Sequence, residues 1–291
     1  MEWVEVSLPA GALADELAAL VATSDEVAAG GVEVRGEEIV VWAPAAEAEA
    51  AAEGVRAAAR RLAQAGFAVD AAAVRVRPAA PEGEWRDAWK KHFRVTRVTA
   101  RIVIVPSWTT HEAAPGDVVL DLDPGRAFGT GSHASTRLCL RELDDLAAEG
   151  NVVTRFLDVG TGSGILSIAA AKLWPAARGV AVDVDPIAVA AAAENLERNG
   201  VGGRVKTSDE AIDVVDGVFE LVLANIQADV LETIKQPLAA RVAAGGTLVL
   251  SGLLAHQALP AADLYERLGF RVERNGVLDD DPEWISLRLR R

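Results

Sequence analysis

A run of glycines followed by a carboxylate is the part of this chain whose residue types and spacing best fit ligand chemistry. The sequence Gly-Thr-Gly-Ser-Gly at residues 160–164 follows an apolar run at 155–159 and precedes a helix-like stretch at 165–173. A second apolar run, 179–182, then ends at Asp183. Glycines let a backbone approach a ligand closely, and a carboxylate can accept hydrogen bonds from both hydroxyls of a ribose. This order predicts one nucleotide-binding half of a doubly wound α/β sheet.

The spacing of the glycines narrows the kind of ligand. Dinucleotide-binding folds use Gly-x-Gly-x-x-Gly, which places a pyrophosphate at the N-terminus of the following helix. This chain has Gly-x-Gly-x-Gly instead, which suits a ligand that carries adenosine and ribose but no phosphate. S-adenosylmethionine fits that description, although the same glycines also suit a plain tight turn from strand to helix.

Two further polar positions stand where expected strands end. Asp183 opens the sequence Asp-Val-Asp-Pro ahead of an alanine-rich helical run, and the buried-strand pattern at 219–226 carries Asn225 near its end. Open α/β sheets bind ligands outside the carboxyl ends of their strands. We therefore predict that four of these residues meet at one S-adenosylmethionine site, namely Gly160, Gly162, Asp183 and Asn225.

The residues after Asn225 indicate the kind of methyl acceptor. Methylation of planar amide or base nitrogens usually places an aromatic ring beside the asparagine, as in Asn-Pro-Pro-Tyr. Here Asn225 is followed by Ile226-Gln227-Ala228, and the only tyrosine, Tyr265, lies in a later helix-like stretch. An sp³ amine is therefore the expected acceptor, held by the side-chain carbonyl of Asn225 as the candidate catalytic residue. A helix cap at the end of a strand is the alternative role for this asparagine.

Residues 1–78 are predicted to form a small α+β domain. The expected elements follow the β-α-β-β-α-β order of a ferredoxin-like fold, at residues 3–8, 12–22, 32–34, 38–42, 45–65 and 67–77. Arg35-Gly36-Glu37 is a hairpin signal between the middle strands, and Gly66 is expected to end the alanine-rich helix. A sheet that binds RNA needs exposed aromatic and basic residues, but this segment holds six Arg or Lys against thirteen Asp or Glu. Protein recognition is therefore the better prediction.

A linker helix is expected at residues 79–94, after the break at Pro78-Ala79-Ala80-Pro81. Trp85, Trp89 and Phe93 recur four residues apart, which places them on one face of a helix. We expect this stripe to pack the helix against the following domain. A platform for an aromatic substrate is the alternative.

Residues 95–291 are predicted to form the methyltransferase domain, whose further strands are expected at 102–105, 118–122, 204–207, 246–251, 270–274 and 284–289, with helices at 137–148 and 258–268. A glycine-rich loop at 123–136 lacks the lysine of a phosphate-binding loop. We expect it to act as a mobile lid, in which Gly129 and Gly131 permit unusual dihedral angles. Phe128 would cover an apolar surface, and Thr136 would offer a hydroxyl.

Composition and charge limit the class of protein. A chain of 291 residues that is 51% hydrophobic can form about two domains with sizeable cores. A single cysteine, Cys139, excludes a disulfide framework, and no Cys/His spacing indicates a metal site. Neither a signal peptide nor a membrane span is visible, so we expect a cytoplasmic protein, and we separately expect a monomer. The net charge of −14 suits either solubility alone or a basic partner, and it argues against direct nucleic-acid binding.

Three motifs together resemble one methyltransferase family. They are Pro124-Gly125-x-Ala127-Phe128-Gly129-Thr130-Gly131-x-His133, Asp158-Val159-Gly160-x-Gly162-Ser163-Gly164-Ile165-Leu166 and Ala224-Asn225-Ile226. The chain is similar in these motifs, and from Trp3 to the final strand, to the bacterial methyltransferases of large-subunit ribosomal protein L11 (protein methyltransferase A). The loop motif is the specific part, because the glycine turn occurs across methyltransferases. Ser135-Thr136 stands where the family commonly has Thr-Thr, which keeps a hydroxyl at both positions.

The resemblance implies S-adenosylmethionine contacts at Thr136, Gly160, Asp183 and Asn225. It also implies that the N-terminal domain recognises a basic ribosomal protein, whose α-amino group and lysine ε-amino groups become trimethylated. Two other classes stay open at this point. One is a methyltransferase that acts on another protein, a small molecule or RNA, and the other is a non-catalytic interaction protein that binds S-adenosylmethionine.

Overall fold

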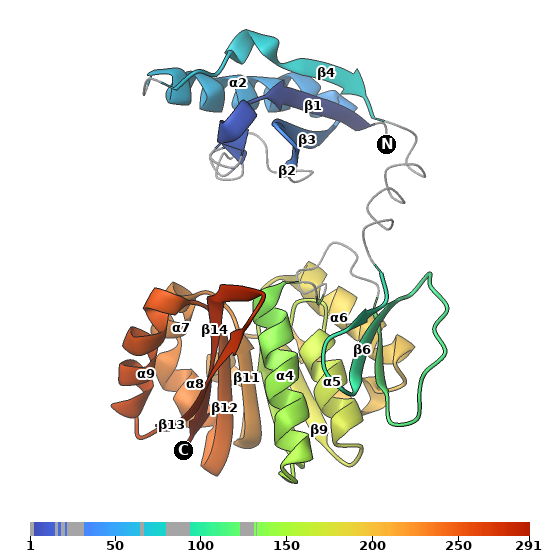
Figure 1. Ribbon diagram of the computed structural model, residues 1–291, viewed down its shortest axis with the longest axis vertical. Coiled ribbons are helices and arrows are strands. Elements are labelled where there is room, and N and C mark those ends of the chain that lie inside the picture. Colours follow the sequence, from blue (N-terminus) through green and yellow to red (C-terminus); the bar gives the residue numbers. More distant parts are fainter. Residues whose placement is uncertain are drawn as a thin grey trace. The chain divides into compact units, whose positions relative to one another are not determined.

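The computed structural model describes residues 3–14, 17–18, 21, 32–64, 67–79, 94–122, 131 and 133–291. The chain divides into two compact units, Met1–Phe93 and Arg94–Arg291 (Figure 1). The division falls at the end of the expected linker helix, 79–94. Most of that segment, with Trp85, Trp89 and Phe93, lies outside the described residues.

The N-terminal unit is built on a four-stranded sheet with the order β2-β3-β1-β4. The strands are β1 (Trp3–Pro9), β2 (Val32–Arg35), β3 (Glu38–Pro44) and β4 (Arg75–Pro78), and each neighbouring pair is antiparallel. Helix α2 (Ala48–Gln64) packs on one face of this sheet (Figure 1). β2 and β3 meet at the predicted hairpin, where Gly36 has a φ of +66°.

The core of this unit is formed by alternate residues of its strands, whose side chains point to the same face of the sheet. Val6 and Leu8 of β1 join Ile39 and Val41 of β3 in one cluster with the apolar face of α2. Ala52 on that face is fully buried. Small alanine side chains allow the helix to approach the sheet closely, so the alanine tract is a packed helix and not a low-complexity segment.

Three predicted elements of this unit differ in detail. The strand expected at 67–77 is shorter, because Asp70 accepts a hydrogen bond from the backbone N–H of Ala72 at 2.9 Å and begins a 3-10 turn, Ala71–Ala73, ahead of β4. The helix expected at 45–65 opens with another 3-10 turn, Ala45–Glu47. The helix expected at 12–22 is described only in part, with a 3-10 turn at Gly11–Leu13.

The second unit is built on a seven-stranded sheet with the order β10-β9-β8-β11-β12-β14-β13. Its strands are β8 (Arg155–Val159), β9 (Arg178–Val182), β10 (Val205–Ser208), β11 (Phe219–Asn225), β12 (Val242–Leu254), β13 (Arg271–Leu278) and β14 (Asp281–Arg290). The strands from β10 to β12 are parallel, whereas β14 is antiparallel to both β12 and β13. The sheet is therefore mixed, and the predicted terminal strand pair supplies its antiparallel edge.

Helices cover both faces of this sheet. One group is α4 (Ala134–Ala148), α5 (Ile165–Leu173) and α6 (Pro186–Arg198), and the other is α7 (Ala228–Thr233), α8 (Lys235–Arg241) and α9 (Ala258–Glu266). Alternate residues of β11 pack on opposite faces of the sheet. Leu221 and Leu223 pack with the first group of helices, and Val222 and Ala224 pack with the second. A strand buried on both faces explains the nearly continuous apolar run in the sequence.

The strands predicted at 102–105 and 118–122 are present but belong to a separate sheet of three strands, β5 (Thr96–Arg97), β6 (Ile102–Pro106) and β7 (Val118–Leu122). This sheet packs on the first helix group. Lys172 of α5 donates to the backbone carbonyl of Val119 at 2.6 Å. Asn199, just after α6, accepts from the backbone N–H of Asp121 at 3.0 Å and donates to its carbonyl at 2.6 Å.

Most of the predicted lid loop, residues 123–130 and 132, lies outside the described residues. The helix after it begins at Ala134, three positions before the predicted start at 137. The reason is local, because His133 takes the N-cap position and its Nδ1 accepts a hydrogen bond from the backbone N–H of Ser135 at 3.3 Å. This cap adds a first helical turn that carries Ser135 and Thr136.

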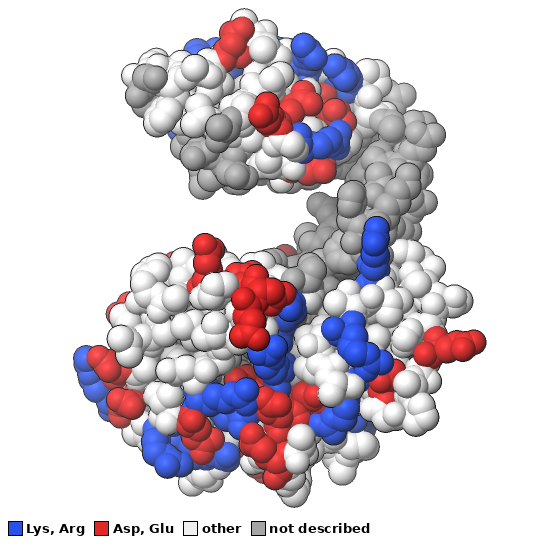
Figure 2. All heavy atoms as spheres, in the orientation of Figure 1, with Lys and Arg blue, Asp and Glu red and all other residues white. Residues whose placement is uncertain are grey.

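The surface shows no single dominant charge on the face that can be seen. Basic and acidic side chains are interspersed over the visible face of the second unit (Figure 2). Among the described helices, none is both long and apolar enough to cross a membrane. No group of three His, Cys, Asp or Glu residues in the described part of the chain is placed to hold a metal ion.

Candidate functional site

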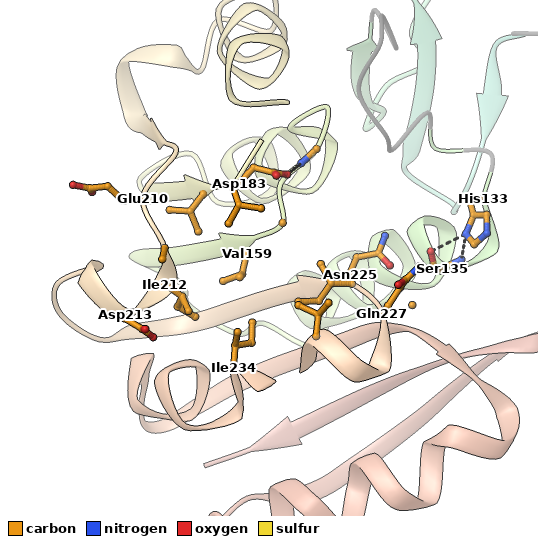
Figure 3. Close-up of a pocket in the computed structure, with 18 of the residues that line it drawn as sticks. His133, Ser135, Val159, Asp183, Glu210, Ile212, Asp213, Asn225, Gln227 and Ile234 are labelled. Carbon is orange, nitrogen blue, oxygen red and sulfur yellow. Dashed lines mark hydrogen bonds between the residues drawn. The ribbon is translucent and has the colours of Figure 1, made fainter. Parts of the chain in front are cut away.

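A cavity of about 640 Å³ opens at the carboxyl ends of β8, β9, β10 and β11 (Figure 3). A volume of this order suits a nucleoside-sized ligand. The lining residues come from the ends of these strands, the start of α4, α7 and the β12–β14 region, and they are His133, Ser135, Val159, Gly160, Gly162, Val182, Asp183, Val184, Glu210, Ala211, Ile212, Asp213, Asn225, Ile226, Gln227, Val230, Ile234, Gly252 and Trp284. Four of the five predicted site residues therefore line one cavity, and the fifth, Thr136, is not among its described lining residues.

The glycine turn needs glycine for conformation and for space. Gly160, Gly162 and Gly164 all have positive φ values, of +72°, +54° and +81°. A Cβ at Gly160 would come within 2.4 Å of Cγ2 of Ile226, the residue after Asn225. A Cβ at Gly164 would lie 3.1 Å from the Cα of Ala192 in α6. The third glycine therefore serves helix packing, and the first lets the turn lie against the end of β11.

Asp183 is tied to the turn by a direct hydrogen bond. The backbone N–H of Gly162 donates to Oδ2 of Asp183 at 2.9 Å, and the N–H of Asp185 donates to Oδ1 at 3.1 Å. Each carboxylate oxygen can accept more than one hydrogen bond. Asp183 is partly exposed and lines the cavity, so acceptor capacity remains for ligand hydroxyls.

Beneath the turn lies a buried carboxylate that was not among the predicted site residues. Thr161 and Ser167 both donate hydroxyl hydrogen bonds of 2.7 Å to Oδ2 of Asp158, which is fully buried. Burial raises the pKa of the Asp158 carboxyl to about 6, although the two hydroxyls oppose that rise. Asp158 thus fastens the glycine turn to the first part of α5. A charged residue within an otherwise apolar strand was the available signal.

Asn225 at the end of β11 is oriented by Thr136. The side-chain amide of Asn225 donates to Oγ1 of Thr136 at 3.2 Å. Thr136 is fully buried, one hydrogen bond behind the cavity wall. Oδ1 of Asn225 is buried and has no hydrogen-bond partner among the described residues. Leaving a buried carbonyl oxygen unpaired costs free energy, unless a ligand donates a hydrogen bond to it.

The electrostatics of the cavity favour a cation and disfavour phosphate. Asp183, Glu210 and Asp213 line it, and no described lining residue is a lysine or an arginine. Glu210 and Asp213 follow β10 and were not predicted. Ligands bind at the carboxyl ends of strands in such sheets. The polar residues that follow the strand predicted at 204–207 were therefore the signal that could have identified Glu210 and Asp213.

The start of α4 and strand β14 supply an aromatic part of the wall that was also missed. His133 and Trp284 line the cavity with their ring centroids 4.5 Å apart and their planes at 74°. Oγ of Ser135 lies 2.8 Å from Nδ1 of His133. His133 stood in the loop motif, but nothing in the sequence placed Trp284 near it, since 151 positions separate the two residues.

Comparisons with known proteins agree on one family. The family model described as "Ribosomal protein L11 methyltransferase (PrmA)" matches residues 13–291. A ribosomal protein L11 methyltransferase of Pelotomaculum thermopropionicum is 43% identical over 211 residues, covering 72% of this chain and 66% of the relative. One from Geobacter metallireducens is 49% identical over 173 residues, covering 60% of this chain and 56% of the relative.

A solved structure gives the same result for the fold. The crystal structure of a ribosomal protein L11 methylase from Lactobacillus delbrueckii subsp. bulgaricus superposes with a TM-score of 0.61 at 29% identity, and covers 68% of this chain and 98% of that one. The two curated relatives are matched over less than two thirds of their own lengths. The family model nevertheless spans nearly the whole chain, including every residue that lines the cavity. The chain belongs to the ribosomal protein L11 methyltransferase family.

Proposed function

We propose that this chain is an S-adenosylmethionine-dependent N-methyltransferase. Its substrate is ribosomal protein L11, of which it methylates lysine ε-amines and the N-terminal α-amine. Membership of the family supports this assignment. The single structural observation that carries it is one cavity that brings together Asp183, the glycine turn and the unpaired carbonyl of Asn225.

The residues of the cavity fit S-adenosylmethionine. Asp183 would accept the ribose hydroxyls, and Gly160 and Gly162 would let the backbone lie close to the ligand. Thr136 would act at the same site through Asn225. The three lining carboxylates and the lack of lysine or arginine among the described lining residues suit a cationic ligand without phosphate. When bound, S-adenosylmethionine supplies an electrophilic methyl group on a sulfonium centre.

The chain's own contribution to the reaction is to position the substrate amine and to favour its deprotonation. Oδ1 of Asn225 can accept a hydrogen bond from an amine N–H and so hold the nitrogen in place. Fixing two reactants in this way contributes about 7–11 kcal/mol to catalysis in favourable cases. A lysine ammonium has an unperturbed pKa near ~10.4, and removal from water into the cavity lowers it. The neutral amine then forms without a dedicated strong base.

We further propose that the N-terminal unit recognises the protein substrate. The antiparallel order β2-β3-β1-β4, with α2 on one face, supports a ferredoxin-like fold for residues 1–78. Residues 79–94 would then be the linker and 95–291 the methyltransferase domain. The excess of acidic residues in the first segment suits a basic ribosomal protein. We also propose that the chain acts as a cytoplasmic monomer without direct nucleic-acid contact.

A methylation assay tests the proposal. The chain is incubated with S-adenosylmethionine labelled on the methyl group and with purified L11, ribosomal RNA or neither. We expect label in L11 alone, and Asn225→Ala should reduce this label more strongly than it reduces cofactor binding. Label in RNA only would favour a different methyltransferase. Cofactor binding without transfer to any ribosomal component would favour a non-catalytic interaction protein.

A further inference from the structure

We propose that Trp284 is a specificity-determining residue that holds the acceptor amine as it becomes methylated. This inference rests on the proposed function, because it concerns the amine subsite of the same cavity. Trp284 would act by cation–π attraction and by packing against N-methyl groups. Its importance should increase with each methyl group that the amine receives.

The position of Trp284 separates it from the carboxylates of the cavity. Asn225, Gln227, Ser135 and His133 lie together at one end, whereas Glu210 and Asp213 lie at the other (Figure 3). The ring of Trp284 is 4.5 Å from that of His133, which places it at the Asn225 end. The residues labelled at this end, His133, Ser135, Asn225 and Gln227, include no carboxylate, and Trp284 joins them through its contact with His133 (Figure 3).

The indole of Trp284 is held in place before any ligand binds. Trp284 pairs with Leu254 across the antiparallel ladder of β14 and β12. It packs against a small buried cluster of Ala134, Leu138 and Leu278, and the His133 ring meets it nearly edge-on. A ring fixed on one side by packing and lining the cavity on the other loses little conformational entropy on binding.

An indole and an amide suit an amine that must give up its proton. A carboxylate at this end would stabilise the ammonium form strongly and raise its pKa. Trp284 and Oδ1 of Asn225 also favour the cation, but less strongly than a carboxylate would, and Oδ1 can still accept a hydrogen bond once the nitrogen is neutral. The amine can therefore bind as the cation and react as the neutral form.

Hydrogen bonding alone does not suffice for repeated methylation. Each transfer forms an N–C bond while the C–S bond breaks with its electron pair left on sulfur, and one N–H proton is released to solvent. The amine thus loses one N–H with each methyl group that it gains. Fewer N–H groups are then left to donate a hydrogen bond to Oδ1 of Asn225. The attraction of an aromatic face needs no N–H and acts on methylated ammonium groups as well.

Mass spectrometry of L11 methylated by the wild type, Trp284→Leu and Trp284→Phe tests whether Trp284 acts mainly on the later methyl transfers. In Trp284→Leu, the ratio of trimethylated to monomethylated product should fall by about fivefold or more, because the later transfers should slow more than the first. Trp284→Phe keeps an aromatic face and should restore most of the ratio. Ile234→Ala, which alters the cavity wall away from the aromatic end, should change total methylation without changing the ratio.

A second measurement begins with the unaltered chain, so its first result does not depend on how the variants fold. Peptides that carry trimethyllysine, or a neutral side chain of the same shape with carbon in place of nitrogen, compete with L11. We expect the cationic peptide to inhibit the wild type about fivefold more strongly, and this preference to shrink in Trp284→Leu. Equal inhibition by the two peptides, or an unchanged product ratio in Trp284→Leu, would overturn the role of Trp284. A wild type that transfers no methyl group to L11 would refute the proposed function itself.

Discussion

Asn225 and Thr136 lie 89 positions apart in the chain, yet they share a hydrogen bond of 3.2 Å at the candidate site. The bond uses the amide nitrogen of Asn225 and leaves Oδ1 buried without a partner among the described residues. In this arrangement the amide nitrogen of Asn225 faces a threonine on the first turn of α4, and the carbonyl oxygen is left to accept a hydrogen bond from a ligand. This contact joins the segment after the loop motif to the end of β11.

Replacing the Thr136 hydroxyl should impair methyl transfer. In Thr136→Val the shape is kept but the acceptor for the Asn225 amide is lost, which costs roughly 0.5–1.5 kcal/mol. We expect kcat/KM for the protein substrate to fall about fivefold, whereas Thr136→Ser, which retains the hydroxyl, stays near the wild type. Steady-state kinetics measures the effect, and calorimetry reports how much of it lies in cofactor binding. Normal kinetics in Thr136→Val would show that the orientation of Asn225 is fixed in another way.

Removing the Asp183 carboxylate should weaken cofactor binding. In Asp183→Ala, charge-assisted hydrogen bonds to the ribose are lost at about 1.5–3 kcal/mol each. Calorimetry should therefore show S-adenosylmethionine affinity reduced at least tenfold. Asp209→Ala is the matched control, because Asp209 is an exposed carboxylate that follows β10 and does not line the cavity. Equal affinities in the two variants would remove Asp183 from the site.

The buried Asp158 should give the second unit a measurable pH dependence. Because the folded-state pKa is raised to about 6, the folded chain binds a proton more tightly than the unfolded chain does. The contribution of the Asp158 carboxyl to the free energy of unfolding is therefore greatest at low pH. It decreases as the pH rises to and through the folded-state pKa. From about pH 5.3 to about pH 7.5 the decrease is about 1 kcal/mol.

Asp158→Asn removes this titration while it leaves an acceptor for Thr161 and Ser167. The difference in melting temperature between the variant and the wild type should therefore shift in favour of the variant as pH rises. Taking the difference at each pH cancels the titration of the other carboxylates. A difference that stays constant over this interval would mean that Asp158 does not titrate within it.

The first glycine of the turn can be tested against a glycine of similar conformation elsewhere. Gly160 and Gly200 both have positive φ, +72° and +68°, but a Cβ at Gly200 would meet nothing within 4 Å. Gly200→Ala should cost about 1–2 kcal/mol of stability and leave methyl transfer unchanged. Gly160→Ala should also displace Ile226 beside Asn225, so transfer should fall more than tenfold. Similar kinetics in both variants would show that the close approach of Ile226 has no role in transfer.

The sequence by itself determined the parts of the fold that depend on local pattern. Apolar runs predicted β8, β9 and β11 to within a residue, because most residues of these strands are apolar and buried, and Asp158 is their one fully buried polar residue. Glycine at positions 160 and 164 permits the positive φ that the turn requires there. The rule that parallel strands present their carboxyl ends at one edge then placed Asp183 and Asn225 at one cavity.

Only the tertiary structure decided the rest, since those features depend on contacts between distant segments. Nothing local brings Trp284 to His133, or Thr136 to Asn225, because each pair is joined by the packing of α4 on the sheet. Helix α4 begins early because of a cap by His133, which is not among the residues that commonly start helices. The strands β6 and β7 look like any others in sequence, and only their pairing with each other and with β5 shows that they form a separate sheet. Local pattern thus specifies the elements and their polar ends, whereas packing selects which side chains meet there.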